Sequence, residues 1–260
     1  MWEFSSDDIK AKIAAMESIG TAVREKIERI EPENYTASKN TELWHVGKFL
    51  YHEKDYTIEV VSESPDFILE GNGKRVGVEL SVMVDDGKKQ IESFKQSLVK
   101  AAVEIFKKRY NTEAFLANVY LKDDHYLFSK KQVPEVASKI ADEIYRFYCD
   151  ETTDPETTVF VEDVARCPAH DLDFDYNPGA YMVAKVTVEH LGEIISKKER
   201  LMDRYQKAEC DEYWLLIVTD NGSSESFFVE EEILSTLKIA CDFDRVYVIE
   251  DIKNNVYRLI

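Results

Sequence analysis

Two short apolar segments, Asp66 to Glu70 and Lys74 to Leu80, have the character of paired strands. They flank Asn72-Gly73, the dipeptide that most favours a type I′ turn, because both central residues of that turn need a positive φ angle. A two-residue turn places Phe67 opposite Val78 and Asp66 opposite Glu79. The pattern therefore predicts a β-hairpin with Asp66 and Glu79 side by side on one face. The other face is apolar and carries Phe67, Leu69, Val76, Val78 and Leu80.

The rest of the chain mixes helical and extended patterns without a repeat. Apolar residues at three- and four-residue spacing predict helices over 7–30, 88–110, 134–148, 191–208 and 229–238. Extended apolar segments predict strands over 43–51, 56–61, 114–121, 181–189, 213–219, 245–250 and 256–260. The polar, proline-containing stretch 149–177 is interpreted as a linker or long loop. This order predicts an α/β fold in which helices flank a mixed β-sheet.

The predicted hairpin places two carboxylates in direct opposition. Like charges across two strands destabilise the pair, so Asp66 and Glu79 need a nearby cation or good solvation. A divalent ion is the obvious cation, because Mg²⁺ binds through one or two carboxylates and keeps several waters. In the simpler alternative, Asp66 ends the turn after Pro65 and Glu79 is an ordinary solvated strand residue.

The order Pro65-Asp66, then Glu79 at the end of an apolar strand, resembles the PD-(D/E)xK nuclease superfamily, which has the restriction-endonuclease-like fold. The resemblance implies that Asp66 and Glu79 bind Mg²⁺ or Mn²⁺. It also implies a lysine two positions after the acid, where this chain has Ser81. In some members of the superfamily that lysine has moved to a neighbouring helix, so such a lysine is expected here.

Lys198 is the best candidate for the moved lysine. It lies in the middle of an apolar stripe over 191–208, where a lysine either extends its ammonium group to the surface or meets a buried partner. The segment from Lys197-Lys198 to Tyr205, followed by Cys210 to Ile217, also looks like a pattern found in nuclease-fold proteins. Three lysines that begin the next helix after Glu79 are alternatives: Lys88, Lys89 and Lys95.

The resemblance implies a single nuclease-like domain over residues 1–260. Its hairpin lies near 56–84 and its final helix and strand near 181–219, which leaves a helical insertion over about 85–180. Alternatively, the helix 88–109 is the first helix of the core, which keeps the core contiguous and makes Lys95 the nearer lysine. The residues leave both arrangements open.

The composition of the 260-residue chain is typical of a folded protein, because 44% of its residues are hydrophobic and 12% are aromatic. No apolar run is long enough to span a membrane, and the amino terminus lacks the pattern of a secretory signal. The four cysteines are scattered without a CxxC pair, which is typical of reduced thiols. We therefore expect a cytoplasmic protein that does not bind membranes.

Charge weighs against nucleic-acid binding, because the formal net charge is −18 and phosphate binding depends on lysine and arginine. The charge is uneven, however. Residues 88–109 contain seven basic and two acidic residues, whereas 150–175 contain nine acidic residues and one arginine. A basic strip on an acidic protein is therefore one interpretation, and a solvated amphipathic helix is the other.

The function expected from the resemblance is metal-dependent hydrolysis of DNA or RNA, with Asp66 and Glu79 as metal ligands and Lys198 as the catalytic lysine. Glu42 is the acid expected to complete the site. Because enzymes that cut both strands of a duplex are commonly dimers, a homodimer is one arrangement that this function allows. Two other interpretations stay open: an inactive nuclease fold that serves binding or assembly, and an acidic interaction domain that mimics nucleic acid.

Overall fold

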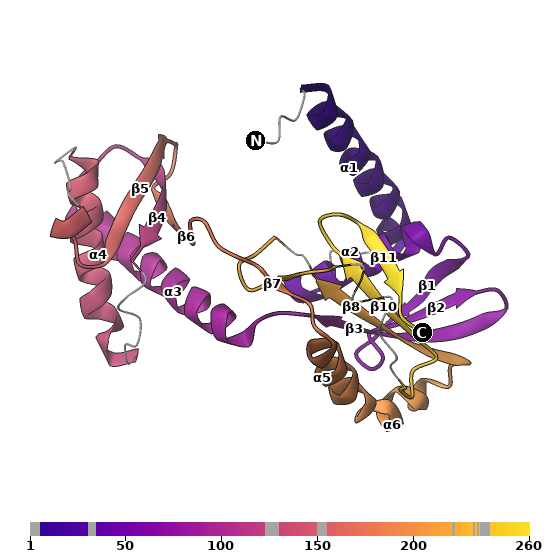
Figure 1. The fold of residues 1–260 in the computed structure, drawn as a ribbon. Coiled ribbons are helices and arrows are strands. Elements are labelled where there is room, and N and C mark those ends of the chain that lie inside the picture. Colours follow the sequence, from indigo (N-terminus) through magenta and orange to yellow (C-terminus); the bar gives the residue numbers. More distant parts are fainter. Residues whose placement is uncertain are drawn as a thin grey trace. The chain divides into compact units, whose positions relative to one another are not determined.

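The structure is a computed structural model that describes residues 6–30, 35–122, 130–149, 155–219, 222–230, 232, 234 and 240–260. It divides into two compact units, Met1–Val84 with Ala184–Ile260, and Asp85–Val183. The second unit covers nearly the same stretch as the expected insertion over 85–180. The first unit is therefore built from segments that precede and follow the second one (Figure 1).

The first unit is built on a six-stranded sheet with the order β1-β2-β3-β8-β10-β11. Its strands are β1 (Tyr56–Val61), β2 (Phe67–Gly71), β3 (Lys74–Val82), β8 (Glu212–Thr219), β10 (Arg245–Glu250) and β11 (Asn255–Arg258). Strands β1, β2 and β3 are antiparallel neighbours, β3, β8 and β10 are parallel, and β11 is antiparallel to β10. The sheet is mixed, as the sequence predicted.

Helices cover both faces of this sheet (Figure 1). The covering helices are α2 (Ala37–His52), α5 (Val188–Glu199) and α6 (Met202–Tyr205), with a short 3₁₀ turn at Gln206–Ala208. Helix α1 (Ser6–Ile27), which ends in a 3₁₀ turn at Glu28–Ile30, packs on α2 instead. Helix α2 packs on the face that carries Phe67, Val78 and Trp214, whereas α5 and α6 pack on the face that carries Leu215 and Ile217. A small parallel pair, β7 (Ala184–Lys185) and β9 (Phe227–Phe228), completes the unit. None of the helices in the described part of the chain combines the length and apolar character that a membrane span requires.

The β2–β3 hairpin has the predicted register, with Phe67 opposite Val78 and Leu69 opposite Val76. Asn72 and Gly73 have φ angles of 52° and 75°, as a type I′ turn requires. The predicted apolar face is buried against α2. Local turn chemistry and side-chain alternation were therefore sufficient to define this element.

The second unit packs two helices on a three-stranded sheet of order β5-β4-β6. Its elements are α3 (Asp86–Arg109), β4 (Phe115–Leu121), a 3₁₀ turn at Lys130–Gln132, α4 (Val133–Tyr148), a 3₁₀ turn at Pro155–Thr157, β5 (Val161–Pro168) and β6 (Asp173–Asn177). The stretch 149–177 is thus not a simple linker, because it contains β5 and β6. These strands flank β4 at the two edges and bury few side chains, so they lack the apolar alternation that identifies a strand.

Two predicted strands differ in the structure. Residues 43–51 lie in α2, where Thr36 caps the helix by accepting a hydrogen bond from the Lys39 N–H, and every third or fourth side chain is buried. The predicted strand 181–189 is reduced to β7, because Thr187 caps α5 in the same way. The predicted helix 191–208 is divided after Glu199 into α5, α6 and a 3₁₀ turn. Most of the helix predicted over 229–238 lies outside the described residues.

Candidate functional site

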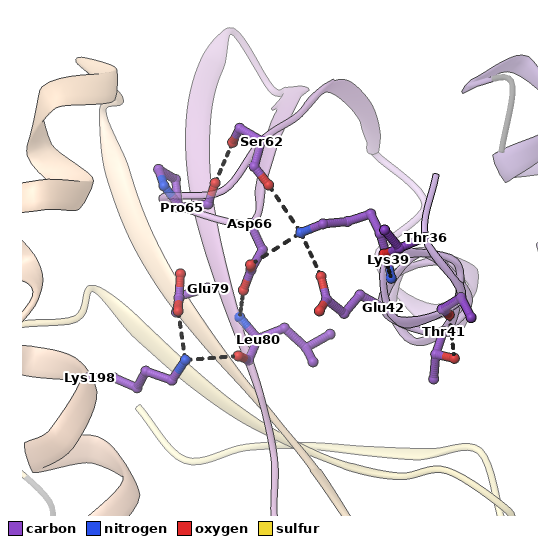
Figure 2. A network of polar contacts seen from close by, with 11 residues as sticks. Thr36, Lys39, Thr41, Glu42, Ser62, Pro65, Asp66, Glu79, Leu80 and Lys198 are labelled. Carbon is purple, nitrogen blue, oxygen red and sulfur yellow. Dashed lines mark hydrogen bonds and ion pairs between the residues drawn. The ribbon is translucent and has the colours of Figure 1, made fainter. Parts of the chain in front are cut away.

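The β2–β3 hairpin brings Asp66 and Glu79 together at one edge of their strands. Asp66 directly precedes β2, and its Oδ2 accepts a hydrogen bond of 2.9 Å from the backbone N–H of Leu80 (Figure 2). Its carboxylate therefore reaches across to β3, where Glu79 is the neighbour of Leu80. Both side chains are largely buried: Asp66 is 15% exposed and Glu79 is 8% exposed.

Lys198 reaches this carboxylate pair from α5. Its Nζ donates hydrogen bonds to Glu79 Oε1 at 2.7 Å and to the backbone oxygen of Leu80 at 3.2 Å (Figure 2). The apolar stripe around Lys198 left two alternatives open, a surface ammonium group or a buried partner. The structure has the buried partner, and that partner is one of the two carboxylates singled out in the sequence.

A second lysine, Lys39 of α2, binds the same site and was not predicted. Its ammonium group contacts three oxygen atoms: Glu42 Oε2 at 2.6 Å, the Ser62 backbone oxygen at 3.1 Å and Asp66 Oδ1 at 3.4 Å (Figure 2). Glu42, the acid expected to complete the site, therefore meets Asp66 through Lys39. The signal that could have identified Lys39 is its place on the buried helical stripe with Leu43, but this region was interpreted as a strand.

The charge of Asp66 is not fully compensated by its surroundings. Burial raises the pKa of Asp66, and the neighbouring charge of Glu79 raises it further. The Leu80 N–H, Lys39 and Lys198 oppose this shift without cancelling it. The pKa of Lys39 is raised because Glu42 and Asp66 outweigh the effect of burial. The site therefore still attracts positive charge, even with two lysines present.

The second oxygen of the Glu79 carboxylate, Oε2, is buried and has no hydrogen bond of normal geometry with any residue that the structure describes. The buried phenol of Tyr205 lies close to this carboxylate. Burial, the charge of Glu79 and a hydrogen bond to Glu79 raise the pKa of Tyr205 far above its ordinary value. Tyr205 is thus a loose partner of Glu79, and a poorly satisfied buried carboxylate oxygen is costly. A bound cation would satisfy it more fully.

The donor set fits a hard divalent ion that is held mainly by water. Within the described ranges, no group of three or more histidine, cysteine, aspartate or glutamate side chains is placed to share a metal. Mg²⁺ does not need such a group, because it commonly binds one or two carboxylates together with waters and substrate phosphates. Asp66 and Glu79 supply those carboxylates, and Glu79 Oε2 and the raised pKa of Asp66 are the observations that favour a cation there.

The alternative lysines belong to the second unit. Lys88, Lys89 and Lys95 are all on α3, and the buried ammonium group of Lys95 lies 5.4 Å from the centre of the Tyr176 ring. The other basic residues of this helix are mostly at the surface, where Lys107 pairs with Glu104 and Arg109 pairs with Asp142. An exposed basic face thus exists on α3, with acids beside part of it.

Comparisons with known proteins do not identify a family for this chain. No family model matches it, and neither the curated proteins nor the solved structures gave a significant match.

Proposed function

We propose that the first unit is a metal-dependent nuclease of the PD-(D/E)xK type, which hydrolyses phosphodiester bonds of DNA or RNA. The order of elements supports this proposal. Helix α2 is followed by the antiparallel strands β1, β2 and β3, and later by α5, α6 and β8, which pairs in parallel with β3. This is the hairpin and the final helix and strand that the resemblance implies, with the second unit between them.

The observation that carries the proposal is the contact between Lys198 and Glu79. The motif lysine is missing at Ser81, two residues after Glu79 on the same strand. Lys198 supplies an ammonium group to the same carboxylate from α5, 119 residues away in the sequence. A lysine beside paired acids could orient an attacking water or stabilise charge that develops on the phosphate.

Asp66 and Glu79 are the residues that would hold Mg²⁺ or Mn²⁺. When bound, such an ion lowers the pKa of water and neutralises phosphate charge. The protein itself positions the groups of the site. Strands β2 and β3 hold the two carboxylates, the Leu80 N–H orients Asp66, and Lys198 binds Glu79. Burial of these groups strengthens each electrostatic interaction by excluding water.

Calorimetric titration of Mg²⁺ and Mn²⁺ into the protein tests this proposal. We expect binding to the wild type and none to an Asp66→Asn/Glu79→Gln double variant. Glu70→Gln is the matched control, because Glu70 is an exposed acid on the same hairpin. Lys198→Met should retain metal binding and lose hydrolysis of single- and double-stranded DNA and RNA by at least about a hundredfold. Wild-type protein that binds no metal, even with an oligonucleotide present, would contradict the nuclease mechanism.

One observation favours the inactive fold as a second candidate. Lys39 and Lys198 already provide two ammonium groups to Asp66 and Glu79, so the site holds cations without a metal. A protein of this kind would bind nucleic acid or a protein partner without cutting it. The same titration distinguishes the two candidates. An inactive module of this kind would bind no divalent ion, either as the wild type or as the double variant.

A further inference from the structure

The unexpected part of the site is Lys39. Its side chain is only 9% exposed, and its ammonium group is surrounded by the oxygen atoms of Glu42, Ser62 and Asp66. Oxygen atoms from two carboxylates and a backbone carbonyl are also the kind of ligands that a hard metal ion takes. The ammonium group of Lys39 thus occupies a cation position that is formed in part by Asp66.

This position is unfavourable for a lysine in two respects. Lys39 lies in the first turn of α2, three residues after the Thr36 cap, where the helix dipole favours negative charge. Its ammonium group is also buried, which costs free energy unless the surrounding oxygen atoms compensate. A sequence under selection for helix stability alone would place an acid here, so the lysine is better explained by its partners Asp66 and Glu42.

The contacts of Lys39 are unequal. The contact with Glu42 is short at 2.6 Å, whereas the contact with Asp66 is 3.4 Å. The ammonium group can therefore leave Asp66 while it keeps Glu42 and the Ser62 backbone oxygen. Lys198, by contrast, is bound to Glu79 at 2.7 Å and to the Leu80 backbone oxygen. Of the two lysines, Lys39 is the one that is more easily displaced from its site carboxylate.

We propose that Lys39 is a displaceable resident cation of the site, whose ammonium group competes with the divalent ion for Asp66 Oδ1. This inference rests on the proposed function, because it requires a metal at Asp66 and Glu79. In the absence of metal, Lys39 limits the repulsion between Asp66 and Glu79 and keeps the hairpin intact. When a divalent ion binds, Lys39 retracts to Glu42. Lys39 therefore sets the affinity of the site for the metal.

Metal affinity of a Lys39→Met variant tests the competition directly. Removing one positive charge beside Asp66 should strengthen binding of Mg²⁺ and Mn²⁺ by at least about tenfold in calorimetry. A purely structural role for Lys39 would leave the affinity unchanged or weaken it. Lys48→Met is the matched control, because Lys48 is a lysine on the same helix that pairs with Asp251 instead. Its affinity for metal should equal that of the wild type.

A Lys39→Met/Glu42→Gln variant separates competition from net charge and from misfolding. It removes both members of one ion pair, so the net charge is conserved and no unpaired partner is left at Glu42. We again expect tighter binding than in the wild type, measured on protein whose circular dichroism matches the wild type. Equal or weaker binding in both variants would overturn the role of Lys39 while the metal site stands. Absence of binding in the wild type and in both variants would overturn the metal site itself.

Discussion

Helix α2 holds two aspartates of the first unit through two lysines, and the two contacts differ in electrostatics. Lys39 contacts Asp66 at the candidate site, and Lys48 contacts Asp251 after β10, with its Nζ 2.7 Å from Oδ1. His45 Nδ1 lies 2.9 Å from the same oxygen of Asp251. Both aspartate side chains are largely, but not fully, buried. The pKa of Asp66 is raised, whereas that of Asp251 is lowered.

The difference lies in the neighbours of each carboxylate. Burial raises the pKa in both places, but at Asp251 the hydrogen bonds with His45 and Lys48 outweigh it. At Asp66 the charge of Glu79 adds to the effect of burial. The contacts of Asp251 thus stabilise its charged form and with it the fold. The charged form of Asp66 is instead disfavoured by burial and by the neighbouring charge of Glu79. Such residual strain is characteristic of functional sites.

The largest effect in this comparison is expected from Asp251→Asn. The substitution removes the carboxylate charge that pairs with Lys48 and that lies 2.9 Å from His45 Nδ1. The largely buried ammonium group of Lys48 then lacks its charged partner. We expect the free energy of unfolding to fall by about 2–3 kcal/mol in urea titrations at pH 7. Asp55→Asn, on the exposed turn after α2, is the control and should change stability little. An Asp251→Asn protein as stable as the wild type would show that the Asp251 network does not stabilise the fold.

Asp66→Asn should act in the opposite direction. Asparagine keeps an oxygen acceptor for the Leu80 N–H and removes the charge that Glu79 repels. The expected result is a gain of about 0.5–1 kcal/mol in the free energy of unfolding, a modest gain typical of substitutions that relieve a functional site. Urea titrations in metal-free buffer measure it, with Glu70→Gln on the same hairpin as the reference. A loss above about 1 kcal/mol would place Asp66 with Asp251 among the stabilising residues.

The smallest expected effect is a difference in how the free energy of unfolding of the two variants depends on pH. The folded-state pKa of Asp251 lies below the unfolded value of about 3.9, so its stabilising contribution is complete above that value and is lost as pH falls through the folded pKa. The folded-state pKa of Asp66 lies above the unfolded value, so its penalty is absent at low pH and grows as pH rises from about 4 through the folded pKa. Denaturation from pH 3 to 7 should show the Asp251→Asn deficit shrinking at the acidic end and the Asp66→Asn gain vanishing there. A pH-independent difference for either variant would contradict the assigned shift.

The parts of the structure that follow from short-range rules were predictable. Asn72-Gly73 defined the turn and register of the hairpin, and β10 has the bounds predicted from its apolar run. The apolar stripe identified Lys198 as a candidate but left a surface ammonium group and a buried partner equally open. The sequence could not choose between Lys198 and Lys95, because both lie on buried helical stripes and only tertiary contacts decide which carboxylate or ring each one meets.

The parts that were missed depend on competition between local signals. Residues 43–51 carry apolar side chains at both two-residue and helical spacing, and packing of α2 on the sheet, with the Thr36 cap, selects the helix. Lys39 was missed as a consequence, because its orientation depends on that helix. Strands β5 and β6 were missed because their side chains are mostly exposed, so only pairing with β4 defines them.

The position of β8 has a consequence for synthesis of the chain. Strand β3 pairs with β2 on one side and with β8 on the other, and the whole second unit is translated between them. At ordinary translation rates, β8 is synthesised on the order of ten seconds after β3, and this edge of the apolar strand β3 is unpaired during that time. An unpaired apolar edge is a template for aggregation. The nascent chain should therefore depend on chaperones most strongly between completion of β3 and emergence of β8 from the ribosome.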